Sequence, residues 1–429
     1  MRVKQRTMQT LMHLYLLLSL LGVRLSGCTV FYATDGEQTL AGTNKSHTNL
    51  ATCIAVYPAD TLHHGRIYLG YRVADGFQNV GGMNEYGLWY DGASLPERGD
   101  ITNVYGKPRV KGELCEFVLE TCTTVAEVRE TYATYFTPHW QGHVMWGDAQ
   151  GECVIIEYGE TDVVFIDQDR SFQVMTNFYL QDTENRAWKR DYRYEAATTL
   201  LENADNNYSH SRCRSVLMET CQVGIPPTVY SAIYDLRARE IRLYNFQAFD
   251  EAAILKMDTL LTEGKRLIDM PGLFSGLKLG APENAATIPA EGGELVWLGD
   301  AQGYQVLVAE DPEFEEAFIF TESTVDWNSG PVWALAILLL PLGYGYPQRR
   351  WRIIVLSGIL LLGTLTGCLN PIFSPYEVSR FEHRTQVFGL EPGRVYFWKV
   401  QRQIEPGITG ESKTSIFWTE SDSEQVGNG

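Results

Sequence analysis

Short apolar and aromatic runs of strand length recur between residues 28 and 270. β-Branched and aromatic residues concentrate in the runs that we expect to form single strands, which are 28–33, 66–73, 87–93, 162–167 and 171–178. Two longer segments, 143–159 and 228–246, each predict a β-hairpin, and residues 148–151 form the turn of the first. This part of the chain is therefore expected to be rich in sheet.

Three segments carry apolar residues at helical spacing instead. They are 112–136, which reads as two pieces, 191–203 and 252–261. Strands and helices are mixed without strict alternation, which is typical of a layered α+β fold.

The composition changes near residue 280. Residues 276–290 are rich in small residues, proline and glutamate, and we expect a linker there. Strand patterning returns in 291–330 and in 370–421, which we interpret as two halves of one small β-sandwich. These halves resemble a fibronectin type III domain. The residues that carry this resemblance are Trp297, Tyr304–Val308, Asp311–Phe314, Leu390–Gly393 and Tyr396–Val400.

Two strongly apolar stretches, 331–346 and 353–369, lie between the sandwich halves. Each is near the lower limit of the ~17–25 residues that a membrane helix needs. Arg349, Arg350 and Arg352 separate them, as expected for the cytoplasmic turn of a hairpin. We expect residues 331–369 to form a transmembrane hairpin, and the alternative is a buried hydrophobic hairpin in a soluble protein.

The N-terminus has the order of segments that is typical of a secretory signal peptide. Basic residues precede an apolar run at 11–23, and the small residues Ser26 and Gly27 follow. We expect residues 1–27 to be removed and the protein to be exported, on the outer face of the cytoplasmic membrane or otherwise outside the cytoplasm. The tetrapeptide Leu25–Cys28 also fits a bacterial lipobox, in which the cysteine would be lipidated.

Charge and cysteine spacing exclude some functions. The 429 residues carry a formal net charge of -18, which disfavours nucleic acid as a partner. None of the eight cysteines belongs to a CxxC pair, so a structural zinc site has no support. We expect no metal and no cofactor.

Cleavage after Gly27 would make Cys28 the first residue of the mature chain. A deprotonated thiol is a good nucleophile. A free α-amine has a pKa of ~7.7–8.0 and can accept a proton near neutral pH. An N-terminal cysteine therefore combines nucleophile and general base in one residue, and attack on an amide would give a thioester.

Several motifs resemble the choloylglycine hydrolase and penicillin V acylase group, and more closely the linear amide C–N hydrolases of that superfamily of N-terminal-nucleophile (Ntn) hydrolases. They are Cys28–Phe31, Leu40–Asn44, Gly81–Leu88, Asp148–Glu152 with Ile156–Glu157, Met175–Phe178, Ser211–Arg214 and Lys256–Phe274. The resemblance covers about residues 28–275. It implies an αββα sandwich with a catalytic N-terminal cysteine.

By position, the resemblance implies roles for four residues. Cys28 would be the nucleophile, Asn177 and the backbone or side chain of Asn84 would bind the oxyanion, and Arg212 would orient the cysteine or tune its charge. Asn84, Asn177 and Arg212 also have a structural interpretation, because asparagines cap turns and arginines occupy helix surfaces.

One position departs from the family pattern. An acid is expected two residues after Asn44, where this chain has Ser46, and many relatives carry Arg or Asn at the position of Thr43. A carboxylate there would hold the α-amine by a charge-assisted hydrogen bond, which an uncharged serine cannot match.

The leading functional hypothesis is an exported hydrolase of small acylated amines, associated with the membrane through residues 331–369. Two alternatives remain open: a catalytically impaired binding protein on the same fold, and a lipoprotein that uses Cys28 only as its anchor.

Overall fold

The computed structural model describes residues 27–97, 106–136, 142–159, 162–182, 191–204, 207–223, 226–299, 303–321 and 381–421. The chain divides into two compact units. The first comprises residues 1–274 with 403–410, and the second comprises 275–402 with 411–429. The expected signal peptide and the expected transmembrane hairpin at 331–369 lie outside the described residues, apart from Gly27. Within the described ranges, no helix is both long and apolar enough to cross a membrane.

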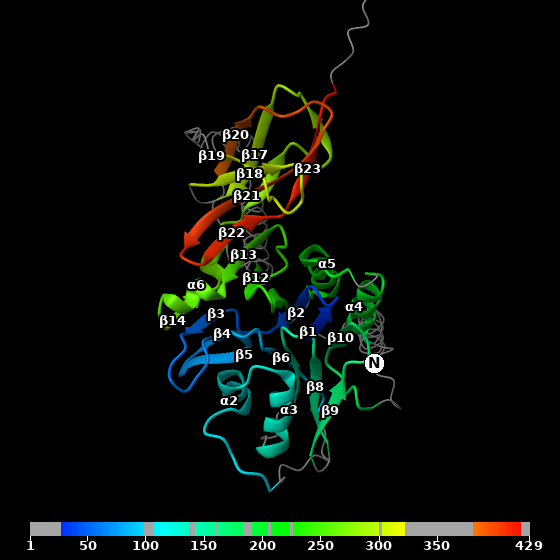
Figure 1. Ribbon diagram of the computed structural model, residues 1–429, viewed down its shortest axis with the longest axis vertical. Coiled ribbons are helices and arrows are strands. Elements are labelled where there is room, and N and C mark those ends of the chain that lie inside the picture. Colours follow the sequence, from blue (N-terminus) through cyan, green and yellow to red (C-terminus); the bar gives the residue numbers. More distant parts are fainter. Residues whose placement is uncertain are drawn as a thin grey trace, which may run out of the picture. The chain divides into compact units, whose positions relative to one another are not determined.

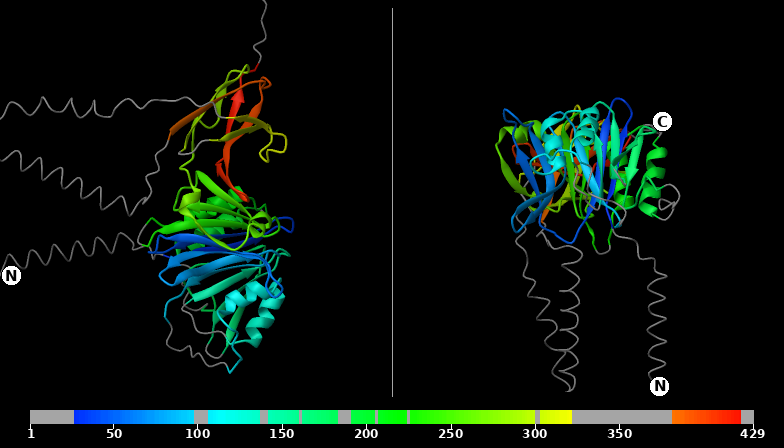
Figure 2. Two further views of the ribbon diagram at one scale, coloured as in Figure 1. Left: turned by 90° about the vertical axis from the view of Figure 1, so that its left-hand side faces the viewer. Right: turned by 90° about the horizontal axis from the view of Figure 1, so that it is seen from below.

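Two antiparallel sheets form the centre of the first unit (Figures 1 and 2). In spatial order, one contains β10 (Phe172–Met175), β1 (Thr29–Thr34), β2 (Thr39–Ser46), β11 (Thr228–Asp235), β12 (Glu240–Asn245) and β13 (Glu251–Lys256). The other contains β14 (Arg266–Asp269), β3 (Thr52–Tyr57), β4 (Arg66–Val73), β5 (Gly76–Asn84), β6 (Trp89–Ser94), β7 (Gly142–Gly147), β8 (Cys153–Tyr158) and β9 (Val163–Asp167). We call these the β1 sheet and the β4 sheet.

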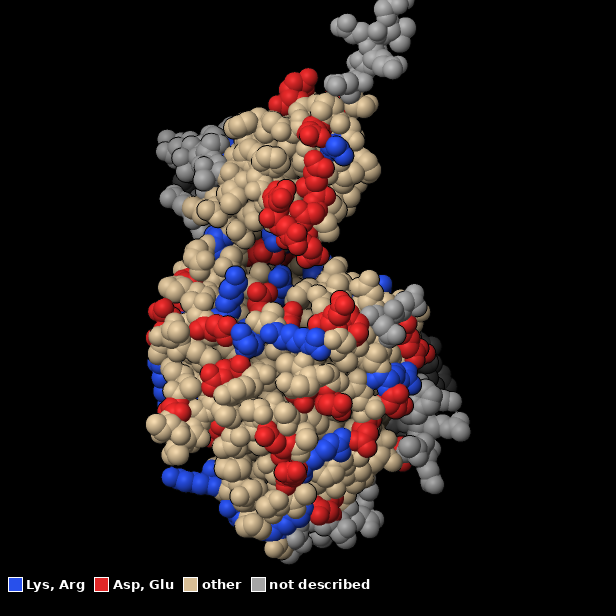
Figure 3. Space-filling view, viewed as in Figure 1, with Lys and Arg blue, Asp and Glu red and all other residues tan. Residues whose placement is uncertain are grey.

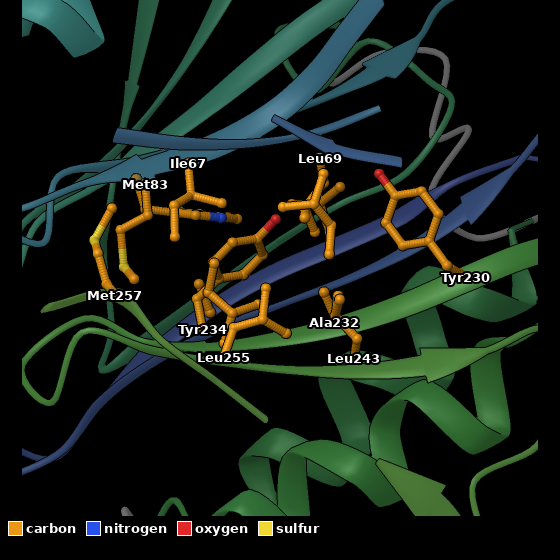
Figure 4. Close-up of a cluster of buried hydrophobic side chains, with 14 of the residues drawn as sticks. Ile67, Leu69, Met83, Tyr230, Ala232, Tyr234, Leu243, Leu255 and Met257 are labelled. Carbon is orange, nitrogen blue, oxygen red and sulfur yellow. The ribbon is translucent and has the colours of Figure 1, made fainter. Parts of the chain in front are cut away.

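Side-chain alternation along the strands produces three separate hydrophobic cores. In β1, Val30 and Tyr32 point between the sheets, whereas Phe31 packs against helices on the outer face. Figure 4 shows the central core, where Ile67 and Leu69 of the β4 sheet face residues such as Ala232 of the β1 sheet.

Helices cover the outer face of each sheet. They are α2 (Leu114–Thr121), α3 (Val125–Thr134), α4 (Tyr192–Glu202) and α5 (His210–Thr220). Helix α6 (Met257–Thr262) and the 3₁₀ turn η2 (Pro271–Leu273) instead contribute residues to the intersheet core. Residues of α4 and α5 share a core with β1, and residues of α2 and α3 share one with the β4 sheet. The first unit therefore has the expected helix–sheet–sheet–helix order of layers.

The helix expected at 252–261 is only partly correct. Residues Glu251–Lys256 form strand β13 and only Met257–Thr262 is helical. Alanine and leucine favour a helix, but pairing with β12 overrides that preference, because Ala253 and Leu255 are buried in the intersheet core.

The second unit is also built on two sheets. One contains β15 (Lys278–Ala281), β17 (Gly293–Gly299) and β20 (Phe381–Val387). The other contains β16 (Ala286–Ile288), β23 (Ser415–Thr419), β21 (Val395–Glu405), β18 (Gln305–Ala309) and β19 (Phe318–Thr321), and β22 (Ile408–Ser412) follows β21. Trp297 and Trp398, one from each sheet, share a single core. The segment expected to be a linker, 276–290, instead contains β15 and β16.

The tip of the hairpin between β21 and β22, residues 403–410, belongs to the first unit. There Ile408 is buried in the core, and Gly407 O accepts the Lys256 N–H at 2.8 Å.

Acidic side chains gather on the face of the second unit that Figure 3 presents. The sandwich halves expected at 291–330 and 370–421 contribute strands to both sheets, while the resemblance to fibronectin type III stays a prediction.

Candidate active site

Cys28 lies directly before β1, the strand between the edge strand β10 and β2. The strand is fixed on both sides, because Val30 pairs with Met175 of β10 and Thr29 pairs with Asn44 of β2. Cys28 is half-buried, carries a free thiol, and packs against the intersheet core. No disulfide joins the cysteines within the described ranges.

A buried arginine holds the backbone of Cys28. Arg193 Nη1 donates to Cys28 O at 2.6 Å and to Asn177 Oδ1 at 3.1 Å. Its Nη2 donates to Asp191 Oδ2 at 2.8 Å, and the side chain is only 1% exposed. Asp191 is also the N-cap of α4, so the helix end positions the guanidinium.

Asn177 lies directly against the backbone before Cys28. Its Nδ2 donates to Ser94 O at 2.7 Å. A Cβ on Gly27 would stand 1.8 Å from Asn177 Oδ1, so only glycine allows this approach. The structure therefore brings together Asn177 and Cys28, two of the residues expected at the site.

A buried histidine and glutamate support the segment that carries Asn177. His143 Nε2 lies 2.6 Å from Thr176 O, and its Nδ1 lies 2.9 Å from Glu157 Oε1. Glu157 also accepts the N–H groups of Leu180 at 2.8 Å and of Gln181 at 3.1 Å. Both ring nitrogens of His143 are therefore engaged, and the ring ties β7 to the segment that carries Asn177.

Ser46, at the position where an acid was expected, faces the Gly27–Cys28 junction. Its Oγ donates to Gly27 O at 3.1 Å and lies 3.3 Å from Thr228 Oγ1. Gln222 Oε1 accepts the Gly27 N–H at 2.9 Å. Uncharged polar groups therefore surround the place where the α-amine of a processed chain would lie.

A buried ion pair links the two sheets close to this junction. Lys45 of β2 pairs with Asp91 of β6, and their side chains are 4% and 0% exposed. Burial raises the pKa of Asp91 to about 6, and the ammonium of Lys45 only partly opposes that shift. Sequence reasoning missed this pair, because its members are separated by 46 positions and belong to different sheets.

Asn84 is the last residue of β5 and does not share these contacts. Its Nδ2 donates to Leu119 O at 3.0 Å and to Cys122 O at 2.8 Å. Its Oδ1 accepts the N–H groups of Tyr86 and Leu88, both at 3.1 Å. Both amide protons are therefore used to hold the end of α2, and neither is left for an oxyanion.

Arg212 lies in the first turn of α5, where its backbone N–H donates to Ser209 Oγ at 3.2 Å. The guanidinium that contacts Cys28 is instead that of Arg193. Sequence reasoning missed Arg193, although an aspartate N-cap followed by arginine at the start of the expected helix was a usable signal.

Comparison with protein-family models and with curated proteins gave no match. Among solved structures, the chain is similar to penicillin V acylase from Agrobacterium tumefaciens. The identity is 18%, the match covers 56% of this chain and 90% of that one, and the TM-score is 0.46.

Two variants of conjugated bile acid hydrolase from Clostridium perfringens are also similar, each at 14% identity. The matches cover 58% and 56% of this chain and 93% and 95% of theirs, with TM-scores of 0.43 and 0.46.

Proposed function

We propose that this protein is an amide hydrolase whose nucleophile is Cys28, acting on small acylated amines. The observation that carries the proposal is the network at the start of β1, where Arg193 binds both the Cys28 carbonyl and the Asn177 amide. It fixes a half-buried free thiol next to a polar side chain that can donate a hydrogen bond. The motifs from residue 28 to residue 275 support the same chemistry.

In this mechanism the Cys28 thiolate attacks the amide carbonyl and a carbon–sulfur bond forms. The carbonyl electrons move to the oxygen, and Asn177 stabilises the resulting oxyanion with the Nδ2 hydrogen that does not point to Ser94. The thiol proton passes through the α-amine of Cys28 to the leaving nitrogen as the carbon–nitrogen bond breaks. Water, deprotonated by the same amine, then hydrolyses the thioester and releases the acid.

The base in this scheme exists only after removal of the residues before Cys28. Ser46, Thr228 and Gln222 would then surround the new amine with neutral oxygen atoms. A free α-amine has an ordinary pKa of ~7.7–8.0, so it can accept a proton near neutral pH.

Replacement of Cys28 tests the proposal. Cys28→Ala should abolish turnover of acyl amides, and Cys28→Ser should reduce it by several orders of magnitude, since the less acidic hydroxyl matches an amine base poorly. Cys115→Ala, which removes another half-buried thiol on α2, is the matched control and should keep full activity. Wild-type turnover by Cys28→Ala would refute the proposal. Absence of acyl amide turnover by the wild type would favour the alternative that the protein only binds its ligand. The uncharged Ser46, at the position where an acid was expected, is the observation behind that alternative.

We also propose that the protein acts outside the cytoplasm, held to the membrane by residues 331–369. The apolar stretches and the arginines between them support this topology. Cysteines introduced at the exposed positions 319 and 414 should react with an impermeant reagent in intact cells, and one at position 350 should not. Labelling at all three positions would contradict it.

A further inference from the structure

Cys28, Lys45 and Tyr230 lie side by side on adjacent strands, on the face of the β1 sheet that packs against the β4 sheet. Thr29 pairs with Asn44, so continuing that register by one residue sets Cys28 opposite Lys45. Lys45 in turn pairs with Tyr230 of β11. Side chains directly opposite each other in a sheet have Cβ atoms ~4.5–5.5 Å apart.

Strand alternation places all three on the same face. Cys28 packs against the intersheet core together with Tyr230, and Lys45 reaches from β2 into the same space. Figure 4 shows Tyr230 rising from β11 with its hydroxyl directed toward the β4 sheet. That hydroxyl is fully buried and has no hydrogen-bond partner in the part of the chain that the structure describes.

Lys45 is held in place from the opposite sheet. It forms an ion pair with Asp91, and its Nζ donates to Gly92 O at 2.5 Å. The register sets Gly81 of β5 beside Asp91, and a Cβ on Gly81 would stand 2.6 Å from Asp91 Oδ2. The absence of a side chain at position 81 leaves space for the carboxylate.

Stability alone is a poor explanation for this pair. Burying two charges carries a desolvation penalty that their attraction often fails to repay, and apolar replacements are frequently neutral or stabilising. Thr43 and Ser46, its neighbours on β2, are uncharged, so Lys45 supplies the positive charge on this part of the strand. An ammonium opposite a thiol has a clear chemical use, since a nearby cation favours the thiolate.

We propose that Lys45, held by Asp91, is the cation that stabilises the thiolate of Cys28. The proposal rests on the proposed function of Cys28 as the nucleophile. The ammonium keeps its protons throughout, and the thiol proton goes to the α-amine, so Lys45 acts by charge alone. Asp91 is a positioning residue that orients the ammonium without touching the sulfur.

The other titratable groups packed around the pair stay neutral near pH 7. Burial raises the pKa of Tyr71, of Tyr230 and of Tyr234 above the ordinary value. His47 stacks on Tyr71 with ring centroids 4.3 Å apart, and partial burial lowers its pKa. Arg193 is a second cation at Cys28, but it is the same in the wild type and the variants. A change in the titration of Cys28 on removal of Lys45 can therefore be assigned to the pair.

The test is the pH dependence of Cys28 alkylation by iodoacetamide in the full-length mature protein, followed by mass spectrometry of the peptide that contains Cys28. The double variant Lys45→Met/Asp91→Asn, called the neutral pair because both replacements are uncharged, should raise the apparent pKa of the Cys28 thiol by ~1 unit or more. It should slow alkylation at pH 7 roughly 10-fold. Lys45→Arg, which keeps the charge, should restore most of the rate. Arg66→Met/Glu120→Gln, which neutralises another ion pair of the first unit, is the matched control and should leave the profile unchanged.

An unchanged thiol pKa in the folded neutral pair would overturn the inference. So would failure of both Lys45→Met/Asp91→Asn and Lys45→Gln/Asp91→Asn to fold, because the ion pair would then be held for stability. Alkylation needs no amide substrate, so this outcome is independent of the turnover test. Wild-type turnover by Cys28→Ala would remove the proposed function without affecting the measured pKa.

Discussion

At the scale of single residues, the site depends on a planar guanidinium with three acceptors. Arg193 spans the Cys28 carbonyl, the Asn177 amide oxygen and the Asp191 carboxylate from one rigid fork. A lysine offers a single nitrogen on a flexible stem and cannot reach three acceptors in one plane.

Arg193→Lys should therefore lower kcat more than it changes KM. We expect a loss of roughly 10- to 100-fold in kcat/KM, or about 1.4–2.7 kcal/mol, because Cys28 and Asn177 lose their common support. Steady-state kinetics on an acyl amide measure it. Arg214→Lys is the control, since Arg214 also donates to a carbonyl, that of Phe249, but lies on α5. Equal kinetics for the Arg193 variant and the wild type would contradict this role.

Ser46 allows the opposite kind of experiment, a gain of function. Its Oγ faces the Gly27 carbonyl, so Ser46→Asp should place a carboxylate beside the new α-amine of the mature protein. The activation free energy for acylation of Cys28 should fall by about 1–2 kcal/mol, the scale of one charge-assisted hydrogen bond. Stopped-flow measurement of the acylation phase tests this. A slower acylation in a folded variant would show that the site is tuned for a neutral partner.

At the scale of elements, the two sheets are joined by a charge pair whose energy depends on pH. The pKa of Asp91 lies at about 6 in the fold, above the value of 3.8 for an unperturbed side chain. The folded state therefore binds an extra proton between these pH values. This contribution to stability is fully present below about pH 4 and is lost as pH rises through 6.

The neutral pair Lys45→Met/Asp91→Asn removes this dependence. Relative to the wild type, its free energy of unfolding should rise by roughly 2–3 kcal/mol between pH 4 and pH 7. Urea unfolding at several pH values gives the difference, and Arg66→Met/Glu120→Gln corrects for general effects of charge. A constant difference between the variant and the wild type over this range would argue against the raised pKa.

Elements with clear local patterns could be predicted from the sequence, and those defined by their neighbours could not. The strands at 66–73 and 163–167 and both hairpins follow from apolar and aromatic runs. Strand β2 was missed because its sequence is poor in strand formers, and it is buried only through pairing with β1 and β11. Helix α5 was also missed, although Cys213, Val216 and Leu217 have helical spacing.

The same division applies to the site. Motif resemblance pointed to Cys28 and Asn177 because it identifies chemistry that is local in sequence, and the structure places these two residues close together. Arg193 and the pair of Lys45 with Asp91 act through contacts between distant segments, which no linear pattern reveals. The side-chain contacts of Asn84 could not be predicted for a related reason, since its amide protons are used by a helix end brought close by the fold.

At the scale of the whole molecule, the chain combines a four-layer unit that carries the site with a smaller two-sheet unit. The net charge of -18 and the acidic face in Figure 3 suit a protein that repels anionic polymers. The chemistry proposed for the first unit requires that processing expose Cys28, because the α-amine is the base.

The state of Cys28 in the mature protein therefore tests the account most directly. Mass spectrometry of the intact N-terminus, before and after reaction with a slow acylating substrate, reads both processing and reactivity in one measurement. The account predicts a chain that begins with free Cys28 and gains one acyl group there, with the other cysteines unmodified. A mature chain that begins with a diacylglyceryl cysteine, or that keeps residues before Cys28 and still turns over amides, would contradict it.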